Sequence, residues 1–344
     1  MPAQRQRPSF FGRRFFNARP GRFRLFFPFD FCLINPPMPT PATIALQGYE
    51  GSYHELAARQ FFGAGPALLP CASFEAVVAG LLSGAAEAAL MGIENSLVGT
   101  IIGNYALLEQ AAVRIVGEVY LPIRHQLLAR PGTRLADVRA VHSHPMALRQ
   151  CAGFLGRYPQ WQLVETADTG RSAQELAQAP APERAPASKV AVVAGAHAAR
   201  LFGLVVLAPD IHDQDPNYTR FLVLERGSPG PDLPAGADKA SLFFQAPHTP
   251  GSLARVLGLL AAHGLNLSKL ESVPQPGQPW HYGFHVDVEF AQPAQLTAAL
   301  RELPGLTQLL RVLGVYRRGG LGNAEELESS SQNQTVSNET TKRC

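Results

Sequence analysis

Apolar runs of strand length alternate with segments of helical spacing through much of this chain. Residues 43–47 and 88–93 form two such runs, and helical patterns at 52–61 and 74–82 lie between them. Further strands are expected at 113–121, 138–142, 162–165, 189–193 and 221–225, and further helices at 145–154, 172–178 and 195–202. Strands that alternate with helices favour an α/β fold, in which a mostly parallel sheet carries helices on its faces.

The pattern changes after a segment rich in Gly and Pro at residues 226–238. The elements expected next are a strand at 240–245, a helix at 251–263, strands at 266–272 and 281–290, a helix at 293–303 and a strand at 308–316. This βαββαβ order is that of a ferredoxin-like unit. The sequence therefore predicts two domains, at 43–226 and 239–318, joined by a linker at 227–238.

The formal net charge of +3 comes from one end of the chain. Residues 1–37 hold seven Arg and a single acid, Asp30, so the rest of the chain is close to neutral. Nucleic-acid binding needs a concentrated basic face, and the near-neutral body therefore makes it unlikely as a function. Neither the leader, 1–42, nor the polar tail, 319–344, has a folding pattern, and we expect both to be disordered.

No apolar run approaches the roughly 20 residues needed to span a bilayer, so we expect no membrane association. Cys32, Cys71, Cys151 and Cys344 are scattered without a CxxC pair, which is typical of reduced intracellular thiols. The leader is rich in Arg but dominated by Phe, unlike an organelle transit peptide. We therefore expect a cytoplasmic protein whose working chain starts at Met38.

Small polar residues follow the ends of several predicted strands. They are Gly51, Ser52, Glu94, Asn95, Ser96, Ser143, Thr169 and residues 217–220. Ligands of open α/β sheets bind at these strand ends, where helix N-termini favour anions. A set rich in neutral donors and poor in catalytic bases suits a small anionic ligand such as a carboxylate. For Ser52 helix capping is the simpler interpretation, because Glu55 completes a capping box.

Two pairs of histidines have spacings that invite a metal interpretation. His142 and His144 flank a strand end, but no further Cys, His or acid lies at metal-site spacing. His281 and His285 lie four apart in a predicted strand, so we expect both on one solvated face. Metal binding is therefore disfavoured, and no phosphate-binding glycine motif indicates a nucleotide.

The triplet Thr219-Arg220-Phe221 is expected to lead from a loop into the strand at 221–224. An arginine at the mouth of a strand can hold a carboxylate through two hydrogen bonds. The alternative, equally open from the local sequence, is that Arg220 pairs with Asp213 or Asp215.

Five segments in register resemble the motifs of the prephenate dehydratase family with a C-terminal ACT domain. GYEGSYHELAA (48–58), GIENSLVGTI (92–101) and HSHPMALRQC (142–151) are similar to its GPxGTFS, PIENSxxGxV and SHPQALxQC blocks. Residues 190–224 are similar to its long block ending in NxTRFLVL, and residues 249–274 to the segment with its GALV and ESRP motifs. The resemblance covers about residues 43–318.

The resemblance implies that prephenate loses carbon dioxide and water to give phenylpyruvate, without a cofactor. It implies a periplasmic-binding-protein-like domain of two α/β lobes, with lobe one at about 43–118 and 195–226, lobe two at about 119–194, and the site between them. Thr219 would donate to the leaving hydroxyl, Arg220 would bind a carboxylate or orient Thr219, and Phe221 would exclude water. The implied substrate-binding residues are Asn95, Glu94, Ser96, Ser143, Gln150, Gly51 and Ser52.

The ACT domain implies phenylalanine as a feedback inhibitor and a homodimer or homotetramer. The positions that match the family's effector motifs are Gly251, Ser252, Leu253, Asn266, Leu267, Glu271 and Ser272. Val273 stands where the ESRP motif has an arginine, which leaves control by phenylalanine open. Arogenate as the substrate, an amino-acid-binding protein without catalysis, and a regulatory protein with an inactive body are the alternatives.

Overall fold

The computed structural model describes residues 41–179, 189–228, 230–275, 277–278 and 280–320. These residues all belong to one compact unit, Pro39–Cys344. The leader expected at 1–42 and the tail expected at 319–344 lie almost wholly outside the described residues. Within the described ranges, none of the helices is both long enough and apolar enough to cross a membrane.

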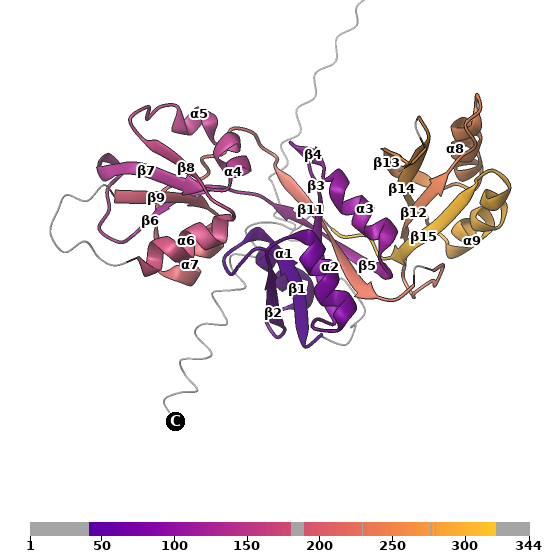
Figure 1. Ribbon diagram of the computed structural model, residues 1–344, viewed down its shortest axis with the longest axis horizontal. Coiled ribbons are helices and arrows are strands. Elements are labelled where there is room, and N and C mark those ends of the chain that lie inside the picture. The colour runs from indigo at the N-terminus through magenta and orange to yellow at the C-terminus, as the bar shows by residue number, and fades with distance from the viewer. Residues whose placement is uncertain (1–40, 180–188, 229, 276, 279, 321–344) are drawn as a thin grey trace, which may run out of the picture. The chain divides into compact units, whose positions relative to one another are not determined.

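The first sheet has the strand order β2-β1-β3-β11-β5, and a short strand β4 pairs with β3 (Figure 1). Its strands are β1 (Thr43–Gln47), β2 (Ala67–Cys71), β3 (Ala88–Asn95), β4 (Gly99–Thr100), β5 (Val113–Pro122) and β11 (Tyr218–Arg226). Its helices are α1 (Tyr53–Phe62), α2 (Phe74–Ser83) and α3 (Ile102–Gln110). Helix α1 begins where the capping pattern predicts, because Ser52 Oγ accepts the N–H of Glu55.

The second sheet has the strand order β10-β6-β9-β7-β8. Its strands are β6 (Gln126–Ala129), β7 (Val138–Ser143), β8 (Gln162–Glu165), β9 (Lys189–Ala194) and β10 (Val205–Ala208). Its helices are α4 (Pro145–Gln150), α5 (Ala152–Leu155), α6 (Thr169–Gln178) and α7 (Ala196–Phe202), with a 3-10 helix η1 at Leu135–Asp137. The single helix expected at 145–154 is therefore divided at Cys151.

Both sheets are mixed, whereas we expected mostly parallel pairing. In the first, β1 runs parallel to β2 and β3, but β11 is antiparallel to both β3 and β5. In the second, β7 is parallel to β8 and β9, while β6 is antiparallel to its two neighbours. The antiparallel strands are those next to the two points where the chain passes between the sheets.

The division between the two lobes differs from the expected one at both boundaries. We expected residues 195–226 in the first lobe, but α7 and β10 belong to the second, where Ala198 and Ala199 pack against Leu128 and Val192. Strand β11 is the element that returns to the first sheet. The expected boundary after residue 118 is also early, since β5 continues to Pro122.

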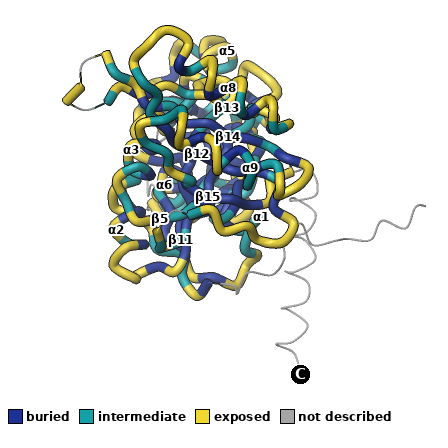
Figure 2. The backbone as a smooth tube through the Cα atoms, turned by 90° about the vertical axis from the view of Figure 1, so that its right-hand side faces the viewer, coloured by how far each residue is buried: buried dark blue, intermediate teal, exposed yellow. Residues whose placement is uncertain are grey.

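The third sheet has the order β13-β14-β12-β15 and confirms the predicted ferredoxin-like unit. Its elements are β12 (Lys239–Gln245), α8 (Ser252–Ala262), β13 (Asn266–Pro274), β14 (Tyr282–Glu289), α9 (Pro293–Glu302), the 3-10 helix η2 (Leu303–Gly305) and β15 (Leu309–Tyr316). Leu242, Val256, Val286 and Leu296 are among the buried residues of its own core. Strand β12 is buried along nearly its whole length (Figure 2).

The expectation that His281 and His285 share a solvated strand face was wrong. Strand β14 begins at Tyr282, so His281 precedes it, and His285 is only 2% exposed. The Nε2 of His285 lies 2.7 Å from Glu109 Oε1 on α3, and its ring packs against Tyr105 and Phe243. The residue therefore contacts the first sheet's α3 from the third sheet.

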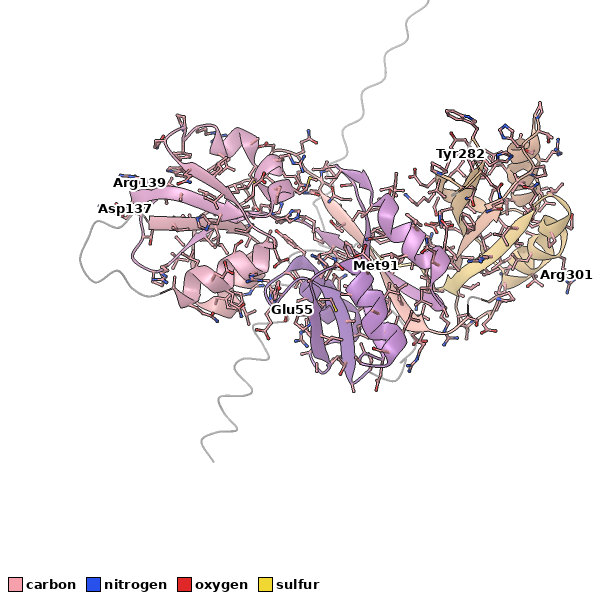
Figure 3. The ribbon with its side chains drawn as sticks, viewed as in Figure 1. Glu55, Met91, Asp137, Arg139, Tyr282 and Arg301 are labelled. Atoms are coloured by element: carbon pink, nitrogen blue, oxygen red, sulfur yellow. The ribbon has the colours of Figure 1, made fainter. Side chains whose placement is uncertain are left out.

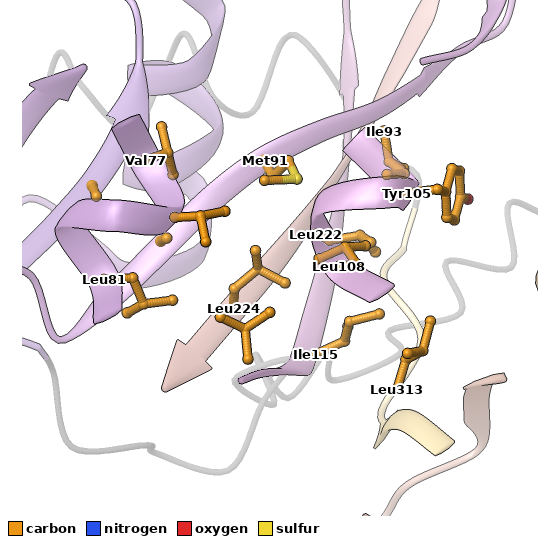
Figure 4. Packing of buried hydrophobic residues seen from close by; sticks show 14 of the residues in the cluster. Val77, Leu81, Met91, Ile93, Tyr105, Leu108, Ile115, Leu222, Leu224 and Leu313 are labelled. Carbon is orange, nitrogen blue, oxygen red and sulfur yellow. The ribbon is translucent and has the colours of Figure 1, made fainter. Parts of the chain in front are cut away.

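Alternate residues of β11 face two different cores, as the period of two in a strand requires. Phe221 and Val223 pack with Leu46, Ala57 and other residues of β1 and α1. Leu222 and Leu224 lie in a cluster that also contains Leu313 of β15 (Figure 4). One face of this strand is thus directed to α1, and the other to the third sheet.

Candidate functional site

Asn95 at the end of β3 lies opposite Thr219 at the start of β11. The Oδ1 of Asn95 accepts the backbone N–H groups of Leu97 and Val98, each at 3.0 Å, which fixes the orientation of its amide. The Nδ2 then donates to Thr219 Oγ1 at 3.0 Å and to Asn217 Oδ1 at 2.8 Å. Because the Thr219 oxygen accepts from Asn95, the hydroxyl hydrogen is left for another acceptor, and no described residue takes it.

Gln150 on α4 joins this cluster from the second lobe. Its Oε1 accepts Asn217 Nδ2 at 3.0 Å and lies 2.9 Å from His125 Nε2. His125 and Asn217 are 3% and 2% exposed, so these are buried contacts. Burial is the main reason that the pKa of His125 falls to about 4, so its ring is neutral at neutral pH. The structure therefore unites three predicted site residues, Asn95, Gln150 and Thr219, with Asn217 of the predicted polar run 217–220 and with His125, which was not predicted.

Arg220 is not at a loop mouth, where we expected it, but inside β11 and 4% exposed. Its guanidinium lies 2.7 Å from Glu118 Oε2 on β5 and 2.5 Å from Asp287 Oδ2 on β14. Both local alternatives, Asp213 and Asp215, are also wrong, since its carboxylate partners are distant in sequence. The side chain is committed to the contact with the ferredoxin-like domain, so it is not available to a ligand carboxylate.

The surroundings of Arg220 form a buried network of opposite charges. Lys239 donates to both carboxylate oxygens of Glu118 at 3.0 Å, and Ser241 and Tyr316 complete the contacts. Burial alone would raise the pKa of Asp287, but Arg220 and Lys239 hold it below its ordinary value. Burial also opposes the charge on Arg220, yet Asp287 leads the groups that raise its pKa. All the charges are paired, which is the condition for keeping them away from water.

Phe221 is 1% exposed and lies in the core between α1 and the first sheet. Its ring meets that of His54 edge to face, with 5.0 Å between the centroids. We expected Phe221 to keep water from the site, and that role stays a prediction. His54 Nε2 is buried without a hydrogen-bond partner among the described residues.

Glu94 and Ser96 flank Asn95 but are engaged elsewhere. The Oε2 of Glu94 lies 3.1 Å from Lys269 Nζ on β13, so this carboxylate faces the ferredoxin-like domain. Ser96 Oγ accepts the N–H of Tyr218 at 2.9 Å and thereby joins β3 to the start of β11. Both residues support the Asn95 loop, the turn at 94–98 between β3 and β4. Neither is brought into the Asn95, Thr219 and Gln150 cluster.

Gly51, Ser52 and Ser143 hold local structure. The N–H of Gly51 donates to Glu55 Oε2 at 2.7 Å, and Ser52 is 2% exposed beneath the start of α1. Glu55, labelled in Figure 3, also lies 3.3 Å from His197 Nε2 on α7. Ser143 is fully buried and donates to the carbonyl of Val193 at 2.6 Å. The helix-capping interpretation of Ser52 accounts for the hydrogen bond that its side chain accepts from Glu55.

The predicted effector residues lie at three places on the ferredoxin-like domain. Gly251, Ser252 and Leu253 begin α8, and Asn266 and Leu267 begin β13. Glu271 and Ser272 lie near the end of β13, where Glu271 Oε2 accepts Thr100 Oγ1 at 2.7 Å. Val273 is 7% exposed in the core shared with the first sheet, a place where an arginine side chain would be buried.

Several residues of these networks were not predicted. They are His125, Glu118, Lys239, Ser241, Lys269, Asp287 and Tyr316. Asn217 differs from them, because it lies in the polar run 217–220 that the sequence singled out. Except for His125, which lies between β5 and β6, the unpredicted residues are single polar residues within strands, and their partners are far away in the chain. Within the described ranges, no group of three or more His, Cys, Asp or Glu side chains is placed to hold a metal ion.

Two family models match successive parts of the chain. The family described as "Prephenate dehydratase" matches residues 44–229, and the ACT domain family matches residues 240–305. The chain is 35% identical over 294 residues to the bifunctional chorismate mutase/prephenate dehydratase of Escherichia coli, covering 82% of this chain and 72% of that protein. It is also 35% identical over 291 residues to arogenate dehydratase/prephenate dehydratase 1, chloroplastic, of Arabidopsis thaliana, covering 79% of this chain and 71% of that protein.

Among solved structures, the chain is similar to prephenate dehydratase in complex with L-Phe from Arthrobacter aurescens. The TM-score is 0.70 at 30% sequence identity, and the match covers 86% of this chain and 98% of the other.

Proposed function

This chain belongs to the prephenate dehydratase family, and we propose that its Asn95, Thr219 and Gln150 cluster converts prephenate to phenylpyruvate. The observation that carries the proposal is the direction of the hydrogen bond between Asn95 and Thr219. Asn95 donates to the threonine oxygen, so the Thr219 hydroxyl hydrogen remains for the substrate. Phenylpyruvate formation would supply the aromatic ring of phenylalanine, and the enzyme is a carbon–oxygen lyase.

The reaction breaks two bonds and makes an aromatic ring. The bond from the ring to the C1 carboxylate breaks, its electron pair enters the ring, and the C4 hydroxyl leaves as water after gaining one proton. Aromatisation supplies the driving force, so no redox group is required. A threonine hydroxyl is a weak acid, and Thr219 therefore acts by a directed hydrogen bond to the departing oxygen, with the proton supplied finally by solvent.

The decisive assay compares kcat/KM for prephenate and arogenate, which differ by a keto and an amino group. Prephenate is expected to be the better substrate. The relative from Arabidopsis carries both activities in its name, so preference for arogenate is the alternative outcome. Absence of turnover with either compound, while both bind, would instead favour a binding protein.

We also propose that phenylalanine inhibits the enzyme through the ACT domain. Support comes from the L-Phe complex of the Arthrobacter protein and from two contacts of β13 with the catalytic domain. Lys269 reaches Glu94 beside Asn95, and Glu271 from the predicted effector motif binds Thr100 on β4. Loss of the motif arginine at Val273 removes one charge from that site, so we expect weaker inhibition than an arginine would permit.

A homodimer or homotetramer formed through ACT domains, and a cytoplasmic location, remain proposals from the family resemblance and the sequence. Light scattering of the purified protein with and without phenylalanine tests the first. Fractionation of cells that express the native protein tests the second.

A further inference from the structure

The chain passes twice between the first and second sheets, and the two passages are hydrogen-bonded to each other. The N–H of Ile123 donates to the carbonyl of Asn217 at 2.7 Å, and the N–H of Ile211 donates to the carbonyl of His125 at 2.8 Å. His125 thus lies on one passage and Asn217 on the other. Between their side chains lies Oε1 of Gln150, which is carried by α4 of the second lobe.

The directions of these hydrogen bonds follow from one fixed end. Backbone N–H groups hold Asn95 Oδ1, so Asn95 Nδ2 must donate to Asn217 and the Asn217 atom that faces it must be the oxygen. The other end of that amide, Nδ2, therefore donates to Gln150, whose facing atom must be Oε1. His125 Nε2 lies 2.9 Å from the same oxygen, so Nε2 must carry the hydrogen of the neutral ring. Nδ1 then carries no hydrogen and lies 3.1 Å from the Tyr53 hydroxyl, which donates to the carbonyl of Arg124 at 2.8 Å.

Both hydrogen-bond positions on Gln150 Oε1 are thus filled by donors. Rotation of the Gln150 amide would bring its NH2 group against two donors, which is electrostatically unfavourable. Its Nε2 is consequently held in one direction, and no described residue accepts from it. His125 and Asn217 together determine which end of Gln150 is offered outward.

We propose that His125 and Asn217 are positioning residues that clamp the Gln150 amide so that its NH2 group donates to a carboxylate or keto oxygen of the substrate. This inference rests on the proposed function, because the substrate oxygen is that of prephenate. Each of the two chain segments that connect the lobes carries one partner of Gln150. A movement of either segment would therefore change the orientation of the Gln150 amide.

A double-mutant cycle on the full-length protein tests the clamp. His125→Ala should lower kcat/KM for prephenate by about 10- to 100-fold, the range for losing a hydrogen bond to a charged group. In a Gln150→Met background the same change should cost less than about threefold, because the group that His125 positions is already absent. Equal losses in the two backgrounds would overturn the proposal, since a structural role of His125 gives an additive effect.

A second measurement does not depend on turnover or on the stability of variants. The ¹⁵N chemical shifts of His125 in the wild-type protein report which ring nitrogen carries the hydrogen. The clamp requires hydrogen on Nε2 at neutral pH, and hydrogen on Nδ1 would contradict it. A protein that has the Nε2–H form but turns over neither prephenate nor arogenate would retain the clamp geometry while rejecting the proposed function.

Discussion

The side-chain amide of Asn95 donates to the hydroxyl oxygen of Thr219 across 3.0 Å, although the two residues are 124 positions apart in the chain. Two backbone N–H groups prevent the Asn95 amide from turning over. The hydroxyl group of Thr219 is consequently oriented before any substrate arrives, and its hydrogen is available to the site. Orientation of this kind reduces the reorganisation that the reaction requires.

Replacement of Thr219 tests whether that hydrogen acts in the reaction. Thr219→Val keeps the shape and removes the hydroxyl, and we expect kcat for prephenate to fall by about 10²- to 10⁴-fold. Thr219→Ser should retain much more activity, because the hydroxyl is preserved. Wild-type kcat in the valine variant would contradict the mechanism.

Asn95→Asp keeps an acceptor for the Leu97 and Val98 N–H groups but cannot donate to Thr219. A loss of about 100-fold in kcat/KM is expected, because Thr219 is no longer oriented and the new carboxylate repels an anionic substrate. Ser96→Ala is the matched control in the same loop. Its kcat/KM should stay within about fivefold of wild type, since one exposed hydrogen bond is worth about 1 kcal/mol or less.

Arg220→Met should act on stability. It leaves Glu118 and Asp287 buried beside a single remaining cation, Lys239, and removing one member of a buried ion pair costs about 3–5 kcal/mol. Arg114→Met is the control, because its pair with Glu225 is partly exposed and should contribute less than about 1 kcal/mol. Urea unfolding measures both. If Arg220→Met has unchanged stability but a much higher KM, then Arg220 binds substrate and the structural role is wrong.

Lys269→Met tests the contact between the ACT domain and the Asn95 loop. Because Lys269 joins Glu94 to Thr100 and Glu271, its loss should weaken phenylalanine inhibition several-fold while kcat without phenylalanine changes little. Arg301→Met, an exposed change on α9, should alter neither quantity. Activity titrated with phenylalanine gives kcat and the inhibition constant. An unchanged inhibition constant in Lys269→Met would show that the Lys269 contact does not transmit the inhibition.

Acid should destabilise the protein partly through His54. Burial lowers the pKa of His54 from 6.5 to about 4, so the unfolded state binds the proton first as the pH falls. The stabilisation is complete above the unfolded pKa and is lost between 6.5 and about 4, by about 2 kcal/mol at pH 5. His54→Leu lacks this group. The difference in unfolding free energy between pH 7.5 and pH 5 should therefore be about 2 kcal/mol smaller in the variant than in wild type.

The fold was predictable where apolar runs have clear ends. Strands β1 and β8 have the predicted bounds, and β12 differs by one residue. Strand β11 begins three residues before the predicted start, because Tyr218, Thr219 and Arg220 carry no apolar signal. Those residues are extended because β3 and β5 pair with them on both sides, which is tertiary information.

The site was predictable in part for the same reason. Asn95, Gln150 and Thr219 lie in segments that resemble family motifs, whereas the partners of Arg220 could not be inferred. Asp287 is 67 residues away and Tyr316 is 96 residues away, both in the other domain. Local sequence offered Asp213 and Asp215 instead. Composition cannot show which of several acids a buried arginine will meet.

Thr219 and Arg220 are neighbours on β11, so the position of one side chain cannot be changed along the strand without changing that of the other. Thr219 faces Asn95, and Arg220 faces Glu118 and Asp287, because successive side chains of β11 point to opposite sides. A shift of β11 by one position relative to β3 and β5 would exchange the two faces. Thr219 and Arg220 would then each point to the face opposite the present one, and neither would keep its partners. Engineers who wish to remove feedback control while keeping turnover should therefore alter the β13 side of the contact and leave the length of β11 unchanged.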